Sequence, residues 1–239
     1  MPAKFVMQQN SIHILCTRPL ENILVEDVKA AGIAIDEISF IETTPIQTIE
    51  VQQEIEQALL LSTTVVFTSM NAVEAVAEWK DEQQPDWNIY CIGTTTNKLT
   101  EQYFGTGSIA GIANSAAALA GLIAEDRFID SVIFFCGDQR RDELPEILRN
   151  NDIEVNEITV YQTIAVPHKI SKIYHGILFF SPSAVDSFFK INTIPQQTIL
   201  FAIGNTTATA IKKYTTNKII ISNATGKENL VKKMIEYFS

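Results

Sequence analysis

The sequence predicts an α/β protein made of two similar doubly wound domains, each built on a parallel sheet. Two observations support this prediction. Short apolar runs alternate with helical patterns from Ile12 to Phe238, and such near-continuous apolar runs are typical of parallel strands covered by helices on both faces. The second half of the chain also repeats the first at a nearly constant offset, which indicates an internal duplication.

The repeat is clearest where a strand ends in glycine and small hydroxyl residues follow. Gly93 and Gly204 lie 111 residues apart (204 − 93), and Ser69 and Ser181 lie 112 apart (181 − 69). The stretch from Ile12 to Ile41 likewise matches Val132 to Tyr161 at an offset of 120 (132 − 12). The offset between the repeats is 120 before the linker and about 112 after it. This difference indicates that the second repeat lacks about eight residues (120 − 112) in its linker region.

The first repeat begins with the buried strand Ile12–Cys16. Pro19 is placed to start a helix, and Gly32 is placed to end it. A second strand leads to a linker that contains Pro45, and apolar spacing at Ile55 and Leu59 predicts the next helix. We therefore expect strands at 12–16, 33–41, 64–68 and 89–92 and near residue 109, with helices at 19–31, 50–61, 71–79, 95–104 and 115–124.

The second repeat follows the same alternation of strands and helices. Its linker contains Val166-Pro167, where a proline disfavours continuation of a helix or a central strand. We expect strands at 132–136, 153–161, 176–180, 199–203 and 218–221, with helices at 142–150, 183–189, 206–214 and 227–238.

Four strand-to-helix turns carry serine or threonine and form two related pairs. Thr206 and Thr207 follow Gly204 where a helix cap belongs, so their hydroxyls and the first free N–H groups should face one place. Such a corner favours an anion, although an ordinary capped helix would have the same sequence. Because ligands of open parallel sheets bind beyond the carboxyl ends of the strands, two domains could present all four turns to one cleft.

Composition limits the classes of function. The net charge of −10 over 239 residues argues against a nucleic-acid coat, which would need a basic stripe. Three cysteines, each at the end of an apolar run, indicate buried free thiols in a reducing compartment. Met1 to Asn10 is polar and no apolar run reaches membrane length. We therefore expect a cytoplasmic protein that binds neither nucleic acid nor membrane.

The sequence contains no convincing motif for a cofactor or a metal. Gly105-Thr-Gly107-Ser-Ile-Ala110 fits a dinucleotide fingerprint but follows a predicted helix rather than a strand. No phosphate-binding Gly-x4-Gly-Lys-Ser/Thr is present, and the three histidines have no metal-ligand spacing. We expect neither a cofactor nor a metal.

The arginines that follow matched strands, and Tyr161, can each be interpreted as either structural or functional. Arg18, Arg140 and Arg141 follow matched strands and are either solvated ion pairs or arginines ready for carboxylates. Tyr161 ends a strand just before a linker. It is either an aromatic plug or a phenol that faces the cleft as a proton donor.

In order and spacing, six short segments resemble the uroporphyrinogen-III synthase family over nearly the whole chain. The segments are Cys16-Thr-Arg-Pro19, Phe67-Thr-Ser-Met-Asn-Ala-Val73, Ile92-Gly-Thr-Thr-Thr96, Val160-Tyr-Gln-Thr163, Phe180-Ser-Pro-Ser183 and Ala202-Ile-Gly-Asn-Thr-Thr-Ala208. The chain departs from the family pattern at Tyr214-Thr215 and Ala224-Thr225, which affects turns more than the expected site.

The resemblance implies two α/β domains joined by a two-stranded linker, with a cleft between them. It places residues 1–40 and 165–239 in one discontinuous domain and residues 44–161 in the other, with linkers at 41–43 and 162–164. The implied function is that of a lyase, uroporphyrinogen-III synthase. The enzyme cyclises the linear tetrapyrrole hydroxymethylbilane to uroporphyrinogen III, with loss of water and inversion of the last ring.

The resemblance also implies roles for individual residues. Tyr161 is implied as the catalytic proton donor. Substrate-binding roles carry over to Thr206, Thr207, Ser69, Ser181 and Thr95, and Arg18 joins them because a guanidinium suits the carboxylates of the substrate. We expect a monomer without cofactor or metal. The alternative is a two-domain protein that binds a small anion without catalysis.

Overall fold

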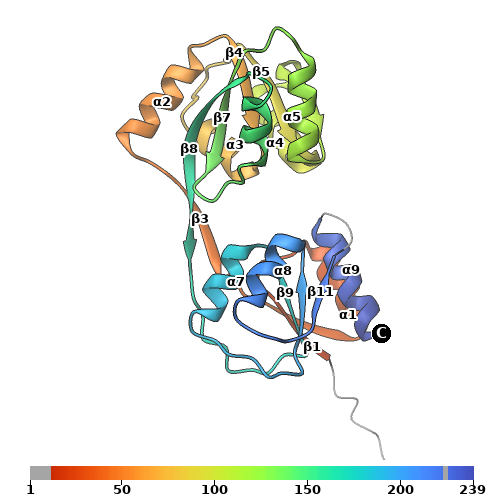
Figure 1. Ribbon diagram of the computed structural model, residues 1–239. Coiled ribbons are helices and arrows are strands. Elements are labelled where there is room, and N and C mark those ends of the chain that lie inside the picture. The colour runs from red at the N-terminus through yellow and green to blue at the C-terminus, as the bar shows by residue number, and fades with distance from the viewer. Residues whose placement is uncertain (1–11, 223–225) are drawn as a thin grey trace, which may run out of the picture. The chain divides into compact units, whose positions relative to one another are not determined.

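The computed structural model describes residues 12–222 and 226–239, which divide into two compact units (Figure 1). Unit 1 combines the chain up to Glu42 with Ile164–Ser239, and unit 2 is the continuous segment Thr43–Thr163. The polar stretch Met1 to Asn10 and the departure at Ala224-Thr225 lie outside the described residues.

Unit 2 carries a sheet of six strands in the order β3-β8-β7-β4-β5-β6, and the strands β3 and β8 run past its boundaries at Thr43 and Thr163. The pairs β4/β5, β5/β6, β4/β7 and β7/β8 are all parallel. The strands are β3 (Ile41–Pro45), β4 (Thr63–Phe67), β5 (Trp87–Ile92), β6 (Ile109–Ala113), β7 (Ser131–Gly137) and β8 (Glu154–Ala165).

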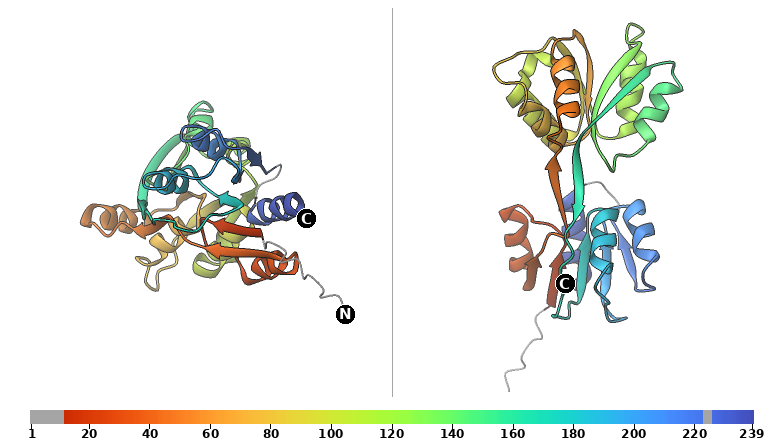
Figure 2. Two further views of the ribbon diagram at one scale, coloured as in Figure 1. Left: turned by 90° about the horizontal axis from the view of Figure 1, so that it is seen from below. Right: turned by 90° about the vertical axis from the view of Figure 1, so that its left-hand side faces the viewer.

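Helices cover both faces of this sheet (Figure 2). One face packs against α2 (Ile49–Leu59), α3 (Met70–Ala77) and α4 (Gly93–Phe104), and the other against α5 (Ala116–Glu125) and α6 (Glu143–Arg149). The alternating side chains of β4 explain this arrangement, because Val65 and Phe67 belong to the first core cluster and Val66 to the second. A short 3-10 helix, η1 (Thr106–Ser108), follows α4.

Unit 1 contains a sheet of five strands in the order β11-β10-β9-β1-β2, and the pairs β1/β2, β1/β9, β9/β10 and β10/β11 are all parallel. The strands are β1 (Ile12–Cys16), β2 (Ile33–Glu37), β9 (Gly176–Phe179), β10 (Ile199–Ala202) and β11 (Ile219–Ile221). Helices α7 (Pro182–Phe189) and α8 (Asn205–Lys212) pack on one face, and α1 (Asn22–Ala30) and α9 (Lys227–Phe238) on the other.

The two sheets share one strand order, because β11-β10-β9-β1-β2 corresponds to β6-β5-β4-β7-β8. This agrees with the matches read from the sequence, including that of Ile12–Ile41 with Val132–Tyr161. The predicted fold class, two α/β domains with parallel sheets covered on both faces, is confirmed. In each sheet the direction of strand succession reverses at one point. This point lies between β9 and β1 in unit 1 and between β4 and β7 in unit 2. Ligands of such folds bind at the reversal, beyond the carboxyl ends of the strands.

Two predicted element boundaries between residues 19 and 41 are wrong. Helix α1 starts at Asn22 rather than at Pro19, because the Leu20 N–H donates to Glu37 Oε1 at 2.6 Å and holds the preceding residues outside the helix. The single strand expected at 33–41 is two strands, β2 and β3. Between them, the Ser39 hydroxyl donates to the Ile41 carbonyl at 2.6 Å and stabilises a break in the strand.

The three cysteines, Cys16, Cys91 and Cys136, are buried and free, as the sequence predicts. Burial raises the pKa of the Cys16 thiol to about 12 and that of Cys91 to about 11, so both are protonated and unreactive at neutral pH. Across the described parts of the chain, none of the helices has the length and apolar character needed to cross a membrane.

Candidate active site

The candidate site of unit 2 lies beyond the carboxyl ends of β4 and β7. Ser69 follows β4, Gly137 is the last residue of β7, and Tyr161 on β8 is the register partner of Gly137. Because β4 and β7 are the neighbours at which the strand succession reverses, these three residues occupy the expected ligand-binding edge of the sheet.

Tyr161 is half-buried and shares a side-chain hydrogen bond with Ser69. Burial raises the pKa of the Tyr161 phenol above its ordinary value, and the negative charges of Cys136 and Asp138 in their ionised forms act in the same direction. The hydrogen bond with Ser69 opposes this rise. The net effect keeps the phenol protonated at neutral pH, as a proton donor requires.

Ser69 is held in place by the start of α3. It is the N-cap residue of that helix, and its hydroxyl oxygen accepts a hydrogen bond from the Asn71 N–H at 3.2 Å. The same hydroxyl group therefore caps the helix and contacts the phenol of Tyr161. This contact brings together two residues that the sequence analysis singled out separately.

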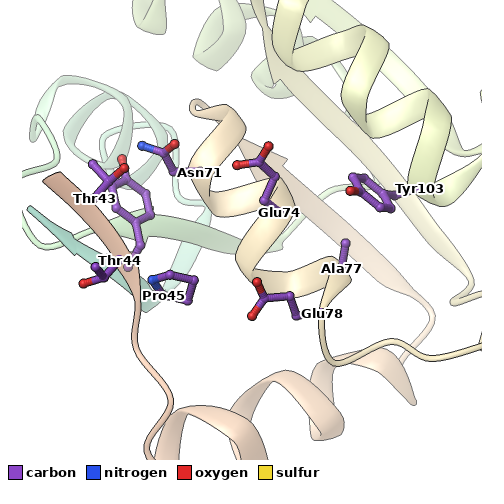
Figure 3. Close-up of a pocket in the computed structure, with 9 residues that line it drawn as sticks. Thr43, Thr44, Pro45, Asn71, Glu74, Ala77, Glu78 and Tyr103 are labelled. Atoms are coloured by element: carbon purple, nitrogen blue, oxygen red, sulfur yellow. The ribbon is translucent and has the colours of Figure 1, made fainter. Parts of the chain in front are cut away.

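A pocket of about 380 Å³ adjoins Tyr161 within unit 2. This volume is at the small end of the range for ligand pockets. Figure 3 shows residues of α3 on one side and Thr43, Thr44 and Pro45 on another. The lining consists of Thr43, Thr44, Pro45, Asn71, Glu74, Ala77, Glu78, Tyr103 and Tyr161.

Two carboxylates give this pocket a negative wall. Glu74 in α3 and Glu78, the C-cap residue of that helix, are both exposed and both line the pocket. Among the residues that the structure describes, no ion pair neutralises either of them. Carboxylates so placed repel acid side chains and attract N–H donors or cations.

Unit 1 presents Ser181 and Arg18 at the corresponding edge of its own sheet. Ser181 is the N-cap residue of α7, and its hydroxyl oxygen accepts from the Ala184 N–H at 3.1 Å. Arg18 follows β1, is exposed, and has its guanidinium carbon 5.8 Å from the centroid of the Phe180 ring. Strands β1 and β9 are neighbours, so both residues lie at the point where strand succession reverses.

The prediction that Thr206 and Thr207 cap a helix is wrong. Helix α8 already begins at Asn205, and Gly204, with extended backbone angles, is its N-cap residue without any side-chain cap bond. Thr206 is an exposed first-turn residue, whereas Thr207 is only 2% exposed. Its hydroxyl is therefore less accessible to a ligand than that of Thr206.

The corresponding turn of unit 2 differs from expectation in the same way. Helix α4 begins at Gly93 rather than at Thr95, and Ile92 is its N-cap residue without a side-chain cap bond. Thr95 is exposed within the first turn. Because β5 lies beside β4 in the sheet, Thr95 remains at the same edge as Ser69.

The arginines that follow the matched strands differ in their surroundings. Arg140 forms ion pairs with Asp142 and Glu157, and Glu157 also pairs with Arg149 at 2.6 Å. This favours the structural interpretation of Arg140. Arg18 is free of ion pairs with the described residues and remains a candidate carboxylate ligand.

The pocket-lining glutamates and Gly137 are functional candidates that could not be recognised from local sequence patterns. Glu74 and Glu78 read as an ordinary solvated helix face, because the wall opposite them comes from the distant residues Thr43 to Pro45. Gly137 has no distinguishing local pattern in the sequence. Its relation to Tyr161 depends on strand register, and a register shift between Cys136 and Gly137 sets that relation.

Comparison with known proteins gives consistent results. A family model described as uroporphyrinogen-III synthase HemD matches residues 23–232. The porphyrin biosynthesis protein HemD of Ruminiclostridium josui is 25% identical over 245 residues, which cover 93% of this chain and 48% of that protein. This chain thus spans about half the length of that curated relative.

Two solved structures share the fold. Uroporphyrinogen-III synthetase from Helicobacter pylori has a TM-score of 0.65 and 16% identity, with 95% of this chain and 99% of that chain covered. A mutant uroporphyrinogen III synthase from Thermus thermophilus has a TM-score of 0.61 and 12% identity, with 95% and 98% covered. The match of the family model over residues 23–232 establishes that the chain belongs to the uroporphyrinogen-III synthase family.

Proposed function

We propose that this chain cyclises hydroxymethylbilane to uroporphyrinogen III, with loss of water and inversion of the last pyrrole ring. The reaction class is that of a lyase. The position of Tyr161 carries the proposal, because a half-buried, protonated phenol lines a small pocket at the ligand-binding edge of the sheet. Family membership and the serine and threonine turns support it.

In the proposed mechanism, Tyr161 donates its proton to the hydroxyl oxygen of the substrate. The carbon–oxygen bond breaks, water leaves, and the electrons of the adjacent pyrrole stabilise the resulting cation. The substituted carbon of the last ring attacks this cation and becomes quaternary, so it has no proton to lose. Its bond to the neighbouring methylene bridge therefore breaks and leaves a second pyrrole-stabilised cation on that bridge. The unsubstituted α-carbon of the turned ring attacks this second cation, and the proton on that carbon is lost as the ring becomes aromatic again. That proton restores the phenol, so the reaction needs no nucleophilic side chain.

The remaining residues have binding roles in this proposal. The substrate is rich in carboxylates, which suit the guanidinium of Arg18 and the helix starts at Ser69, Ser181, Thr95, Thr206 and Thr207. Thr206 is a better hydroxyl donor than the buried Thr207, whose contribution is limited to packing and the backbone N–H. We also propose that the protein acts as a cytoplasmic monomer that engages neither nucleic acid nor membrane.

The test of this function is an assay of hydroxymethylbilane consumption in which the product isomer is identified. The substrate also closes spontaneously to the isomer without ring inversion, so this background is measured without protein and subtracted. Accelerated formation of the inverted isomer is the expected result. Tight binding of the substrate with only the background isomer formed would instead identify a binding protein and refute the proposal.

We expect the activity to survive removal of divalent metals. In the described residues, 12–222 and 226–239, no group of three or more His, Cys, Asp and Glu side chains could hold a metal ion. The proposed chemistry requires only a proton donor and an oriented substrate. The measurement is turnover after exhaustive chelation and gel filtration, and a loss of activity that one added metal restores would contradict the proposed mechanism.

The negative wall of the pocket leads to a second expectation. Because Glu74 and Glu78 repel acid side chains, we expect the pocket to receive a pyrrole ring and its developing positive charge. Replacing Glu74 with Gln should therefore lower kcat roughly two- to fivefold, the size expected for an exposed charge pair. KM should not rise, because the change also removes repulsion from the acidic substrate.

The matched control is Glu125→Gln, which removes the same charge from an exposed position at the end of α5, outside the pocket. This variant should keep the parent kcat. If Glu74→Gln raises KM and leaves kcat unchanged, Glu74 contributes to ground-state binding and the assignment of the pocket to the cationic ring is wrong.

A further inference from the structure

The ring of Tyr161 fills the space that a side chain on Gly137 would occupy. A Cβ atom built on Gly137 would lie 2.3 Å from Cζ, 2.5 Å from Cε2 and 2.7 Å from the hydroxyl oxygen of Tyr161. Favourable contacts between carbon atoms are about 3.5–4.0 Å. Any residue other than glycine at this position therefore forces the phenol to move or the strands to separate.

Backbone conformation does not explain the glycine. The glycines with a positive φ are Gly32, Gly93, Gly105 and Gly226, and Gly137 is not one of them. Its backbone is thus open to residues with side chains. The requirement for glycine comes from the phenol of Tyr161.

The backbone around Tyr161 is fixed from both sides of this contact. The Asp138 N–H donates to the Tyr161 carbonyl at 3.1 Å. The Thr163 N–H donates to Asp138 Oδ1 at 2.9 Å. These bonds hold β8 to the segment that follows β7. Crowding at Gly137 is therefore relieved more easily by rotation of the Tyr161 side chain than by separation of the strands.

We propose that Gly137 is a positioning residue for the phenol of Tyr161, because its missing side chain makes the space in which the ring lies. The inference rests on the proposed function of Tyr161 as the proton donor. In this arrangement the ring packs over Gly137, while its hydroxyl reaches Ser69 and the ring borders the pocket. A methyl group at position 137 would move the phenol away from both.

The test is the Gly137→Ala variant, assayed for inverted product. Displacement of a catalytic group by about 1 Å costs up to roughly 10²-fold in rate, so we expect kcat to fall about 10- to 100-fold with KM nearly unchanged. Gly121→Ala is the control, because a Cβ at Gly121 meets nothing within 4 Å and its φ is not positive. That variant should keep the parent kcat.

A double-mutant cycle separates positioning from general damage. If Gly137 acts through the phenol, Gly137→Ala should cause little further loss of rate once Tyr161 has been replaced with Phe and the donor removed. A purely structural role would give the same fold-loss in both backgrounds. Equal losses, or a kcat for Gly137→Ala within twofold of the parent, would overturn the proposal.

The position of the Tyr161 ring can also be tested without an activity assay. The ionisation of Tyr161 can be followed by ultraviolet titration, as the difference between a protein and its Tyr161→Phe counterpart. If Gly137→Ala moves the phenol toward water, the raised pKa of Tyr161 should fall toward its ordinary value. An unchanged titration would refute the positioning role, whatever the protein proves to catalyse.

A third variant covers the case in which Gly137→Ala does not fold. Truncating the ring with Tyr161→Ala removes the atoms that crowd position 137, so the double variant Gly137→Ala/Tyr161→Ala should fold. Recovery of folding would support the proposed contact. A double variant that is as unstable as Gly137→Ala alone would show that the methyl group clashes elsewhere and would overturn the inference.

Discussion

The Tyr161→Phe variant is expected to form uroporphyrinogen III roughly 10²–10⁴-fold more slowly than the parent, the usual contribution of a positioned general acid. This corresponds to about 3–5 kcal/mol of activation free energy. Phenylalanine keeps the ring that packs over Gly137, so the free energy of unfolding should hardly change. The measurement is turnover of hydroxymethylbilane by the purified variant, with spontaneous closure subtracted.

Tyr237→Phe is the matched control for this change. Tyr237 is an exposed residue of α9 outside the pocket, and its replacement also removes one phenolic hydroxyl. We expect this variant to retain the parent rate. If Tyr161→Phe also retains the parent rate, Tyr161 is an aromatic plug and the proton comes from elsewhere, such as water held at the serine and threonine turns.

The pH dependence of the rate provides a related check. Burial holds the pKa of Tyr161 above the ordinary phenol value of about 10. The acid form is therefore fully present below that value and is lost only as the pH rises through the raised pKa. Loss of activity between pH 7 and 9 must accordingly arise from another group, and Tyr161→Phe should leave that part of the profile unchanged in shape.

Phe135→Ala is expected to have the largest effect on stability and to destabilise unit 2 by about 3–5 kcal/mol. The Phe135 side chain is 0% exposed. Its ring centroid lies 5.5 Å from that of Phe67 and 5.7 Å from that of Trp87. Truncation removes these aromatic contacts and leaves a cavity in the centre of the core.

Tryptophan fluorescence in denaturant can report this change selectively, because both tryptophans of the chain, Trp79 and Trp87, belong to unit 2. Phe128→Ala is the control, since the Phe128 side chain is 98% exposed and its loss should alter the transition by less than about 0.5 kcal/mol. Equal midpoints for the two variants would disprove the assignment of Phe135 to the core.

Most of the fold could be predicted because its strands are short apolar runs separated by amphipathic helices. The match between Ile12–Ile41 and Val132–Tyr161 also anticipated the common strand order of the two sheets. The errors came from contacts between residues distant in sequence. Pro19 fits a helix start locally, but the hydrogen bond from Leu20 to Glu37 delays the helix to Asn22.

The candidate site was predictable only in part, for a related reason. Ser69 and Tyr161 stood out because each ends an apolar run with a polar side chain, and the structure places them in contact. Nothing in a local pattern distinguishes Gly137 from an ordinary turn glycine, because its importance lies in a cross-strand partner. The glutamates Glu74 and Glu78 likewise acquire meaning only from the wall opposite them.

The division of unit 1 between two distant segments has a consequence for biosynthesis. Strand β1 is translated well before its partner β9, with Cys16 paired to Leu178. At about 5–20 residues per second, β1 waits roughly 8–30 s on the ribosome for this neighbour. Unit 2 emerges complete during that interval and can fold first, so the nascent chain must keep the apolar edge of β1 from aggregating until β9 arrives.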